Sequence, residues 1–382
     1  MLFLVLKEVI TIKKILFGIT SLTLGGAERV LVDISNKLSE KYDITIFSIY
    51  DNGELKNDLN KNVKFKALYN CRYDELTKLQ KMWIPIKILL FSKIIYNKKI
   101  KQNYDTEIAF LEGPITRLFS TKNKDVHKIA WIHNDIEKVF GNDLKSKIKK
   151  YIDKKIYKKY NDLVFVSQDN MEKFQNIYND LNTENMHVIY NYIDKDLVIK
   201  KSNYNIKVEF DYNSINFLTV CRLVKQKAID RFIRVHSKLI NRGLKHKVYI
   251  IGDGPEKENL QKLIKQENVE DTFVLLGKKE NPYPYVKNAN YFCLLSEFEG
   301  YGMVLEEAKI LNKPIIITNT AARECIENYP KALILENSED EIYDGLYKLL
   351  NDNDDKIFNN TQTNTEYDNT EKLQKIIELV GD

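Results

Sequence analysis

The sequence predicts an α/β protein with two doubly wound domains, each built on a parallel sheet that helices cover on both faces. Its 382 residues are 43% hydrophobic, which is ample for two separate cores. Short, almost continuously apolar runs alternate with helical patterns, as expected of parallel strands buried on both faces. This alternation stops at a polar, irregular stretch, residues 195–214, and then starts again. We therefore expect one domain on each side of a linker.

The first domain is expected over residues 1–194. Its strand-like runs are residues 14–20, 43–49, 106–113, 128–134, 162–168 and 187–194, and a helical pattern spans residues 27–41. The second domain is expected over residues 215–365. Its strand-like runs are residues 215–223, 247–254, 272–278, 291–297 and 314–320, with helical patterns over residues 229–242 and 257–266. Residues 366–382 are expected to form a last helix that returns to the first domain.

Composition excludes several classes of protein. The net charge of +5 is too small to indicate a nucleic-acid partner. The cysteines form no C-x-x-C pair, which favours reduced thiols in a cytoplasmic protein; they are Cys71, Cys221, Cys293 and Cys325. No apolar run reaches the roughly 18 residues that a transmembrane helix needs. The apolar start of the chain lacks a small-residue cleavage site, so we expect no signal peptide.

Unusual residues follow the strands, at the edge where doubly wound sheets bind ligands. These are Gly25, Gly26, His133, Arg222, Gly252, Asp253, Gly254 and the acidic stretch 296–308, "SEFEGYGMVLEEA".

In the acidic stretch, Glu299 is expected in a loop and Glu307 on the following helix. Two such carboxylates can face one ligand from two sides, and a carboxylate suits the vicinal diol of a sugar. The glycines Gly300 and Gly302 let the backbone approach a phosphate at the helix N-terminus. Acids that only favour the helix dipole would account for Glu297 or Glu306, but not for the glycines.

Several motifs, in order along the chain, resemble one family. "SEFEGYGMVLEEAKILNKPII" is similar to the signature of the family 4 retaining glycosyltransferases (glycosyl transferases group 1). "LGGAERVLVDISNKL" resembles their N-terminal glycine loop, "VIYNYID" their interdomain segment, and "CRLVKQKAIDRFI" their Gly-Arg-Leu-x-x-x-Lys-Gly motif. "YIIGDGPEKENLQKLI" and "VLLGKKEN" also match in place. The resemblance implies the GT-B fold, in which two Rossmann-like domains face a cleft, with the acceptor on the first domain and a nucleotide-sugar on the second. We expect the nucleotide to be UDP.

The resemblance also implies roles for individual residues. Glu307 should bind the ribose of the donor and Glu299 its sugar, while Arg222 and Lys227 should bind the diphosphate. His133 should lie near the donor sugar, although a lone histidine is more often a packing or surface residue. The other implied substrate-binding residues are Gly25, Gly26, Asn191, Gly252, Asp253, Gly254, Gly277, Gly300, Tyr301 and Gly302, and Glu324 matches a further motif position.

Two lysine-rich stretches lie in the first half of the chain. Residues 78–103 combine seven lysines and no acid with large apolar residues, as interfacial helices do. Residues 145–159 hold eight lysines, for which a solvated helix face is an equally good interpretation. We expect peripheral attachment to the anionic inner face of the plasma membrane, where a lipid-linked saccharide acceptor for capsule or exopolysaccharide synthesis would be met.

No cofactor or metal is expected. Asp194 and Asp196 form a D-x-D pattern, but it lies at the domain junction. The chain departs from the family pattern where Cys221, Ala228, Ala321 and Ala322 replace glycines. Three alternatives therefore remain: a UDP-sugar 2-epimerase of the same fold, a catalytically inactive binding subunit, and, more remotely, a nicotinamide enzyme, although no G-x-G-x-x-G motif is present.

Overall fold

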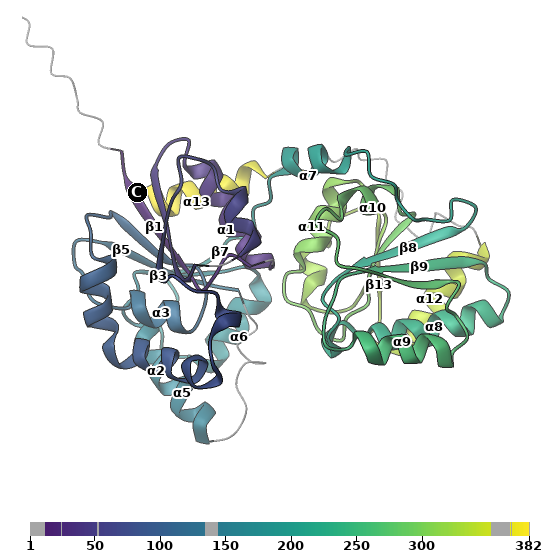
Figure 1. Cartoon of the computed structure of the whole chain (residues 1–382), viewed down its shortest axis with the longest axis horizontal. Helices are drawn as coiled ribbons and strands as arrows, with labels where there is room; N and C mark the ends of the chain where they lie inside the picture. Colours follow the sequence, from purple (N-terminus) through teal and green to yellow (C-terminus); the bar gives the residue numbers. More distant parts are fainter. Residues whose placement is uncertain are drawn as a thin grey trace, which may run out of the picture. The chain divides into compact units, whose positions relative to one another are not determined.

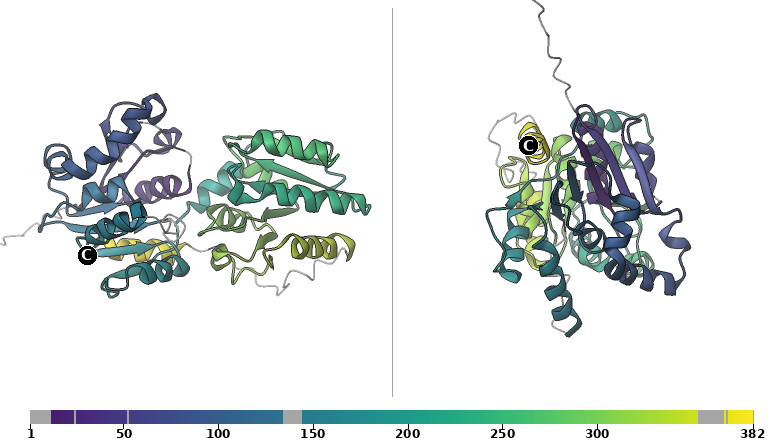
Figure 2. Two further views of the ribbon diagram at one scale, coloured as in Figure 1. Left: turned by 90° about the horizontal axis from the view of Figure 1, so that it is seen from below. Right: turned by 90° about the vertical axis from the view of Figure 1, so that its left-hand side faces the viewer.

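Figure 1 shows the computed structural model of the chain, which describes residues 12–381 apart from residues 24, 52, 134–143, 353–366 and 368. The chain divides into two compact units. The N-terminal unit comprises Met1–Tyr192 together with Thr370–Asp382, and the C-terminal unit comprises Ile193–Asn369. In each unit, helices cover both faces of a parallel sheet (Figures 1 and 2).

The described part of the N-terminal unit contains a seven-stranded sheet of order β3-β2-β1-β4-β5-β6-β7. Its strands are β1 (Lys14–Ile19), β2 (Asp43–Tyr50), β3 (Lys64–Tyr69), β4 (Thr106–Ala109), β5 (His127–Ile132), β6 (Asp162–Phe165) and β7 (Met186–Val188). Its α-helices are α1 (Gly26–Leu38), α2 (Lys78–Ile95), α3 (Pro114–Phe119), α5 (Leu144–Tyr157), α6 (Gln168–Ile177) and α13 (Thr370–Gly381).

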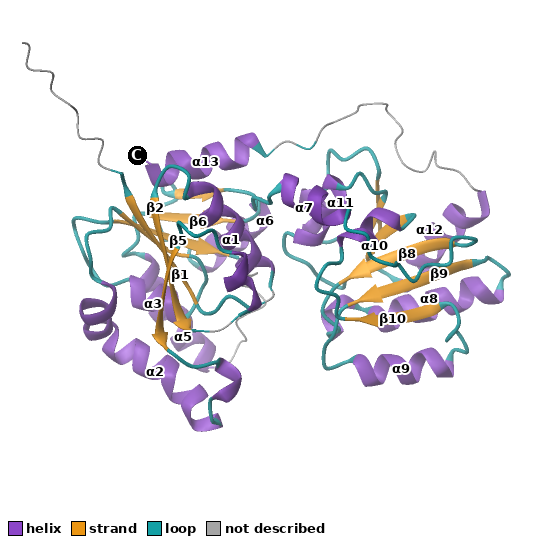
Figure 3. Cartoon of the chain, turned by 45° about the horizontal axis from the view of Figure 1, so that its top comes forward, coloured by secondary structure: helices purple, strands orange, loops and turns teal. Residues whose placement is uncertain are grey.

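The C-terminal unit contains, within its described residues, a six-stranded sheet of order β10-β9-β8-β11-β12-β13 (Figure 3). Its strands are β8 (Ile215–Val220), β9 (His246–Ile251), β10 (Phe273–Gly277), β11 (Tyr291–Leu294), β12 (Ile315–Thr318) and β13 (Ala332–Leu335). Its α-helices are α7 (Lys195–Ser202), α8 (Ile229–Asn241), α9 (Lys257–Gln266), α10 (Tyr283–Asn288), α11 (Met303–Ile310) and α12 (Glu339–Asp352).

The predicted α/β class with two doubly wound parallel sheets is confirmed. Two strands that the apolar pattern did not predict, β3 and β13, lie at sheet edges. An edge strand is buried less completely than a central one, and most residues of β3 are half-buried. Such strands lack the continuous apolar run that marks the interior of a parallel sheet.

Each sheet has one point at which the strand order reverses. In the N-terminal unit this point lies between β1 and β4, and in the C-terminal unit it lies between β8 and β11. The crossovers leave in opposite directions from these two neighbouring strands. The loops at such a reversal point are the usual ligand site of doubly wound sheets.

The stretch predicted as an irregular linker contains a helix. Residues Lys195–Ser202 form α7, which Asp194 caps by accepting a hydrogen bond from the backbone N–H of Leu197 at 2.9 Å. Helix α7 packs beside α10 and α11, where Val198 is buried with Tyr283 and Ile310 (Figure 3). The carboxylate of Asp194, part of the D-x-D pattern, is therefore a helix cap.

The last helix, α13, groups with the N-terminal unit, although the whole C-terminal unit precedes it in the sequence. Ile376 and Val380 are buried there, and the Thr106 hydroxyl donates to the backbone carbonyl of Val380 at 3.4 Å. The Lys13 ammonium also donates to the carbonyl of Gly381. This helix thus completes the side of the sheet near β1 and β4.

A buried ion pair lies inside the N-terminal unit. Lys128 Nζ is 2.6 Å from Glu107 Oε2, with the two side chains 3% and 0% exposed. The Tyr96 hydroxyl donates to Glu107 Oε1 at 2.6 Å, and Lys128 also donates to the carbonyl of Phe119 at 2.8 Å. Burial lowers the pKa of Lys128, and Glu107 opposes that shift. The ion pair with Lys128 and the hydrogen bond from Tyr96 thus offset the cost of burying the Glu107 charge.

Replacing Lys128 with methionine is expected to lower the free energy of unfolding by about 3 to 5 kcal/mol, because Glu107 would stay buried without a cation. The double variant Glu107→Leu/Lys128→Met should recover much of this loss, since the buried charge is removed as well. Urea unfolding followed by circular dichroism measures both. The matched control is Lys37→Met in the exposed Lys37–Glu40 pair, which should cost less than about 1 kcal/mol. Equal losses in the two single variants would contradict this account.

Candidate active site

Two predicted site residues meet at the reversal point of the C-terminal sheet. Lys227 follows β8 and Glu299 follows β11, and their side chains form an ion pair. The side chain of Lys227 is 15% exposed and that of Glu299 is 13% exposed. The Ser296 hydroxyl donates a second hydrogen bond to Glu299 Oε2 at 3.2 Å. A cation and a carboxylate thus lie together at the reversal point, where doubly wound sheets usually bind ligands.

The loops that carry this pair are joined by backbone contacts. The N–H of Glu297 donates to the carbonyl of Gln226 at 2.9 Å, and the Gln226 side chain donates to the carbonyl of Phe298 at 3.0 Å. Because these hydrogen bonds hold the two loops together, they also fix the positions of Lys227 and Glu299 relative to each other. Gln226 carried no motif signal, since its role depends on a contact between distant segments.

The loop with Arg222 is fixed by the loop after β9. The N–H of Leu223 donates to the carbonyl of Asp253 at 3.0 Å, and the N–H of Gly252 donates to the carbonyl of Gly277 at 3.0 Å. Gly252 has a φ of +150°, and a Cβ there would lie 1.8 Å from the carbonyl oxygen of Cys221. Glycine is therefore required at this position. The Arg222 side chain is exposed beside this junction.

Glu307 lies on α11 and is oriented by a residue that the motifs did not identify. The Tyr283 hydroxyl donates to Glu307 Oε1 at 3.0 Å, and Tyr283 itself is buried against α7. The stretch around Tyr283 has no family motif, so the sequence offered no signal for this contact. The helix in the predicted linker thus supports a predicted ribose-binding residue.

Tyr301, a predicted substrate-binding residue, turns its side chain into the protein. It is 6% exposed, and its hydroxyl donates to Glu306, which is 1% exposed. Burial, with the neighbouring Cys325 and Glu306, raises the pKa of Tyr301 well above its ordinary value. The Tyr301–Glu306 hydrogen bond therefore supports the loop of Gly300 and Gly302 from its buried side. The Tyr301 hydroxyl makes this hydrogen bond within the protein.

The alanines and the cysteine that replace the expected glycines are accommodated in the loops of the C-terminal unit. Ala228 has φ 47° and ψ 38°, a left-handed conformation that glycine adopts more readily than alanine. Ala322 is buried, and its Cβ lies 3.4 Å from where a Cβ on Gly302 would be. Burial raises the pKa of the Cys221 thiol to about 12, so this cysteine remains a neutral thiol beside Lys227 and Glu299.

In the N-terminal unit, the predicted residues follow β1, β5 and β7. The ring of His133 packs on Phe110, with ring centroids 4.7 Å apart, and its backbone N–H donates to Glu112 Oε1 at 2.8 Å. His133 Nε2 is buried, and so is Asn191 Oδ1; neither atom has a hydrogen-bond partner within the described chain. Gly25 caps α1 and, with Gly26, is exposed.

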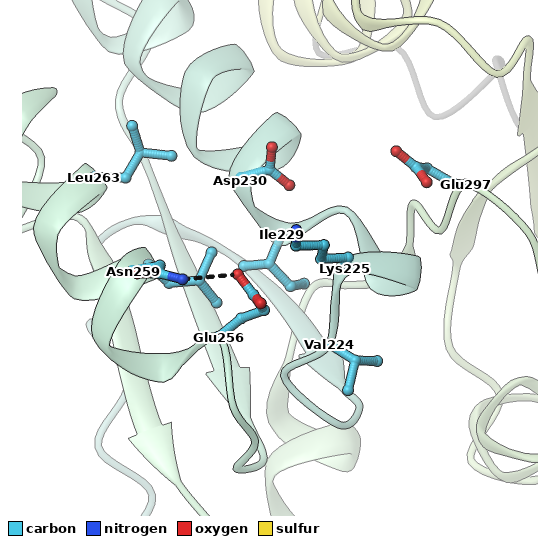
Figure 4. Close-up of a pocket in the computed structure, with 9 residues that line it drawn as sticks. Val224, Lys225, Ile229, Asp230, Glu256, Asn259, Leu263 and Glu297 are labelled. Carbon is cyan, nitrogen blue, oxygen red and sulfur yellow. Dashed lines mark hydrogen bonds between the residues drawn. The ribbon is translucent and has the colours of Figure 1, made fainter.

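A pocket of about 370 Å³ adjoins the loops of the C-terminal unit (Figure 4). Its lining residues are Val224, Lys225, Ile229, Asp230, Glu256, Asn259, Leu260, Leu263 and Glu297. None of these is a predicted donor-binding residue. The pocket nevertheless shares its walls with the loops that carry Arg222, Lys227 and Glu299, and the Asn259–Glu256 hydrogen bond of 3.1 Å closes one side (Figure 4).

Comparison with solved structures identifies the fold. Anabaena Alr3699/HepE, solved in complex with UDP and glucose, superposes with a TM-score of 0.73 at 17% identity, covering 97% of this chain and 99% of that protein. TarM superposes with a TM-score of 0.73 at 16% identity over 98% and 99% of the two chains. The fold is GT-B, the fold of glycosyltransferases.

Sequence comparison agrees. A glycosyltransferase of Campylobacter jejuni, N-acetylgalactosamine-N,N'-diacetylbacillosaminyl-diphospho-undecaprenol 4-alpha-N-acetylgalactosaminyltransferase, is 27% identical over 87% of this chain and 89% of its own. The O-antigen biosynthesis glycosyltransferase WclY of Escherichia coli is 24% identical over 80% of each chain. Residues 200–366 match the model of the family described as glycosyl transferases group 1. The chain is a glycosyltransferase, and this part of it belongs to that family.

The buried ring nitrogen Nε2 of His133 leads to a prediction about pH. Burial lowers its pKa from 6.5 to about 3, so between these values only the unfolded chain takes up the proton. Stability should therefore fall as the pH falls below 6.5. Relative to His133→Gln, the protein should lose about 2.7 kcal/mol of unfolding free energy between pH 7.5 and pH 4.5.

Urea unfolding at a series of pH values measures this difference. The other buried histidines, His236 and His246, are present in both proteins and cancel in the comparison. Parallel pH curves for the protein and the His133→Gln variant would show that the folded state protonates His133 freely, and would overturn the assignment of a buried neutral imidazole.

Proposed function

We propose that the chain transfers a sugar from a UDP-linked donor, with retention at the anomeric carbon, to a lipid-linked or growing saccharide in surface polysaccharide synthesis. The enzyme would act on the cytoplasmic side of the plasma membrane as a peripheral protein. The observation that carries this proposal is the meeting of Lys227 and Glu299 at the reversal point of the C-terminal sheet.

The paired charges suit a nucleotide-sugar donor. A leaving nucleoside diphosphate gains negative charge as the glycosidic bond breaks, and nearby cations stabilise that charge. Lys227, with the exposed Arg222 close by in the chain, supplies this stabilisation without a metal. Glu299 accepts hydrogen bonds from the hydroxyls of the donor sugar. The diphosphate then replaces Glu299 as the partner of Lys227. The Lys227 charge is therefore neutralised both before and after the donor binds.

Glu307 provides the second anchor of the donor. Its carboxylate accepts from the two hydroxyls of the ribose, while Tyr283 keeps it in position through the 3.0 Å hydrogen bond. The backbone of Gly300 and Gly302 lies next to the N-terminus of α11, where N–H groups favour a phosphate. The glycines after β9 and β10 leave space for the base.

Retention follows if the acceptor oxygen attacks the face from which the diphosphate leaves. The bond from the anomeric carbon to the diphosphate oxygen breaks, the bond to the acceptor oxygen forms, and the diphosphate takes the acceptor proton. Arg222 and Lys227 balance the charge of the leaving group throughout. His133 lies in the N-terminal unit as a neutral donor or acceptor for a sugar hydroxyl. Its Nε2, which is buried and has no hydrogen-bond partner among the described residues, supports that role.

The names of relatives support the choice of donor and acceptor. The Campylobacter jejuni relative acts on a diphospho-undecaprenol-linked sugar, WclY belongs to O-antigen biosynthesis, and HepE was solved with UDP. These properties suggest a UDP-sugar and a lipid-linked saccharide for this chain.

Thermal unfolding with UDP, GDP, UDP-sugars and NAD tests the donor site. At about 100 times its dissociation constant, UDP should add about 2.7 kcal/mol to the stability of the protein. Glu307→Gln should weaken UDP binding by about 10- to 150-fold, because a charged hydrogen-bond acceptor of the ribose is lost. The control is Glu258→Gln, an exposed acid on α9, which should leave the UDP shift unchanged.

The outcomes separate the alternatives. No shift with any nucleotide would contradict an active donor site and favour an inactive binding subunit. A shift with NAD alone would rule out the proposed UDP-linked donor. A shift with UDP-sugar followed by conversion of the sugar without an acceptor would indicate an epimerase.

The stereochemical prediction concerns the product. With an α-linked UDP-sugar, proton NMR of the first product formed should show the small anomeric coupling constant of an α-linkage. A β-linked product would rule out retention, whatever the donor or acceptor.

A further inference from the structure

Helix α2 of the N-terminal unit exposes a row of large apolar side chains. They are Leu79, Met82, Trp83, Ile86, Leu90, Phe91 and Ile94, each between 40% and 68% exposed. The residues from Leu79 to Leu90 recur at intervals of three or four, so they share one face of the helix. Phe91 has a non-helical backbone, so Phe91 and Ile94 lie at and beyond a kink. Ile84 and Ile88 lie on the opposite face, are 9% and 0% exposed, and attach α2 to the core of the unit.

The helix itself is well defined at its start. Thr77 caps it, since its side chain accepts from the N–H of Gln80, and the Gln80 side chain returns a contact to the Thr77 N–H at 2.9 Å. The helix packs against α3 along its inner side (Figure 1). The apolar face is therefore presented to solvent by a fixed element, and a contiguous apolar surface of this kind marks an interaction site.

The charges on α2 and on the turn that follows it have one sign. Lys78, Lys87 and Lys93 are exposed on α2, and Lys98 and Lys99 follow in the next turn. Residues 78–103 contain no acid, and none of these lysines has an ion-pair partner within the described part of the chain. A basic apolar face needs a partner that is negatively charged at its surface and apolar beneath it.

We propose that the α2 face docks on an anionic lipid bilayer by inserting its apolar side chains between the headgroups while the lysines contact the phosphates. A second copy of the chain would bring the same lysines against each other, so charge complementarity favours the bilayer. Among the described helices, none has the length and apolar character needed to cross a membrane, and insertion of one helix face requires neither. The inference deepens the proposed function, because it gives the membrane contact of an enzyme with a lipid-linked acceptor.

The tryptophans make this insertion directly measurable. The chain has two, and Trp131 is 1% exposed in the core whereas Trp83 is 58% exposed on α2. Vesicles containing phosphatidylglycerol should shift the tryptophan emission to shorter wavelength, and brominated lipids should quench it. Vesicles of phosphatidylcholine alone should do neither. Vesicle binding without any change in emission would overturn insertion of the α2 face.

Two variants separate the apolar and the electrostatic parts. Leu90→Ser should weaken vesicle binding about tenfold, and the triple variant Lys78→Gln/Lys87→Gln/Lys93→Gln about 100-fold. The matched control is Tyr212→Ser in the C-terminal unit, because Tyr212 and Leu90 are both 68% exposed. Equal binding by the Leu90→Ser and Tyr212→Ser variants would contradict the proposal. So would a dimer in gel filtration that Leu90→Ser abolishes, since the occupant would then be a second copy.

Vesicle binding needs neither donor nor acceptor, and the thermal shift with UDP needs no lipid. Failure of the membrane inference is thus distinguishable from failure of the proposed function.

Discussion

Every strand pair in the described parts of both sheets is parallel, and the rest of the structure depends on that constraint. Parallel neighbours cannot be joined by a hairpin, so the chain must cross over between strands, usually through a helix. All the loops that follow strands then collect at one edge of each sheet. Lys227, more than seventy residues before Glu299 in the sequence, reaches it because β8 and β11 are neighbours whose loops leave at the same edge.

The site is assembled by contacts between loops. Gln226 joins the loops after β8 and β11, and Leu223 joins the loops after β8 and β9. Helix α7 supports Tyr283, which in turn orients Glu307. A cation and a carboxylate that neutralise each other also avoid the cost of an isolated, largely buried charge.

Much of this arrangement could be predicted from local sequence. Continuous apolar runs identified the central strands, and the motifs around Arg222, Lys227, Glu299 and Glu307 placed them after those strands. Local sequence could not identify what depends on pairing between distant segments. The edge strands β3 and β13 lacked a full apolar run, Tyr283 lacked a motif, and the inward turn of Tyr301 follows from its contact with Glu306. Helix α7 was not predicted because residues 195–214 are mostly polar. A helix this short buries too few apolar residues to give a clear periodic pattern.

The chain passes between its two units twice, once after Tyr192 and again after Asn369. The N-terminal unit is therefore discontinuous, and the Ile376 and Val380 side chains that it buries belong to α13, which follows the whole C-terminal unit in the sequence. On the ribosome, the C-terminal unit has all its residues before α13 is made. Until then, part of the surface of the N-terminal sheet stays uncovered.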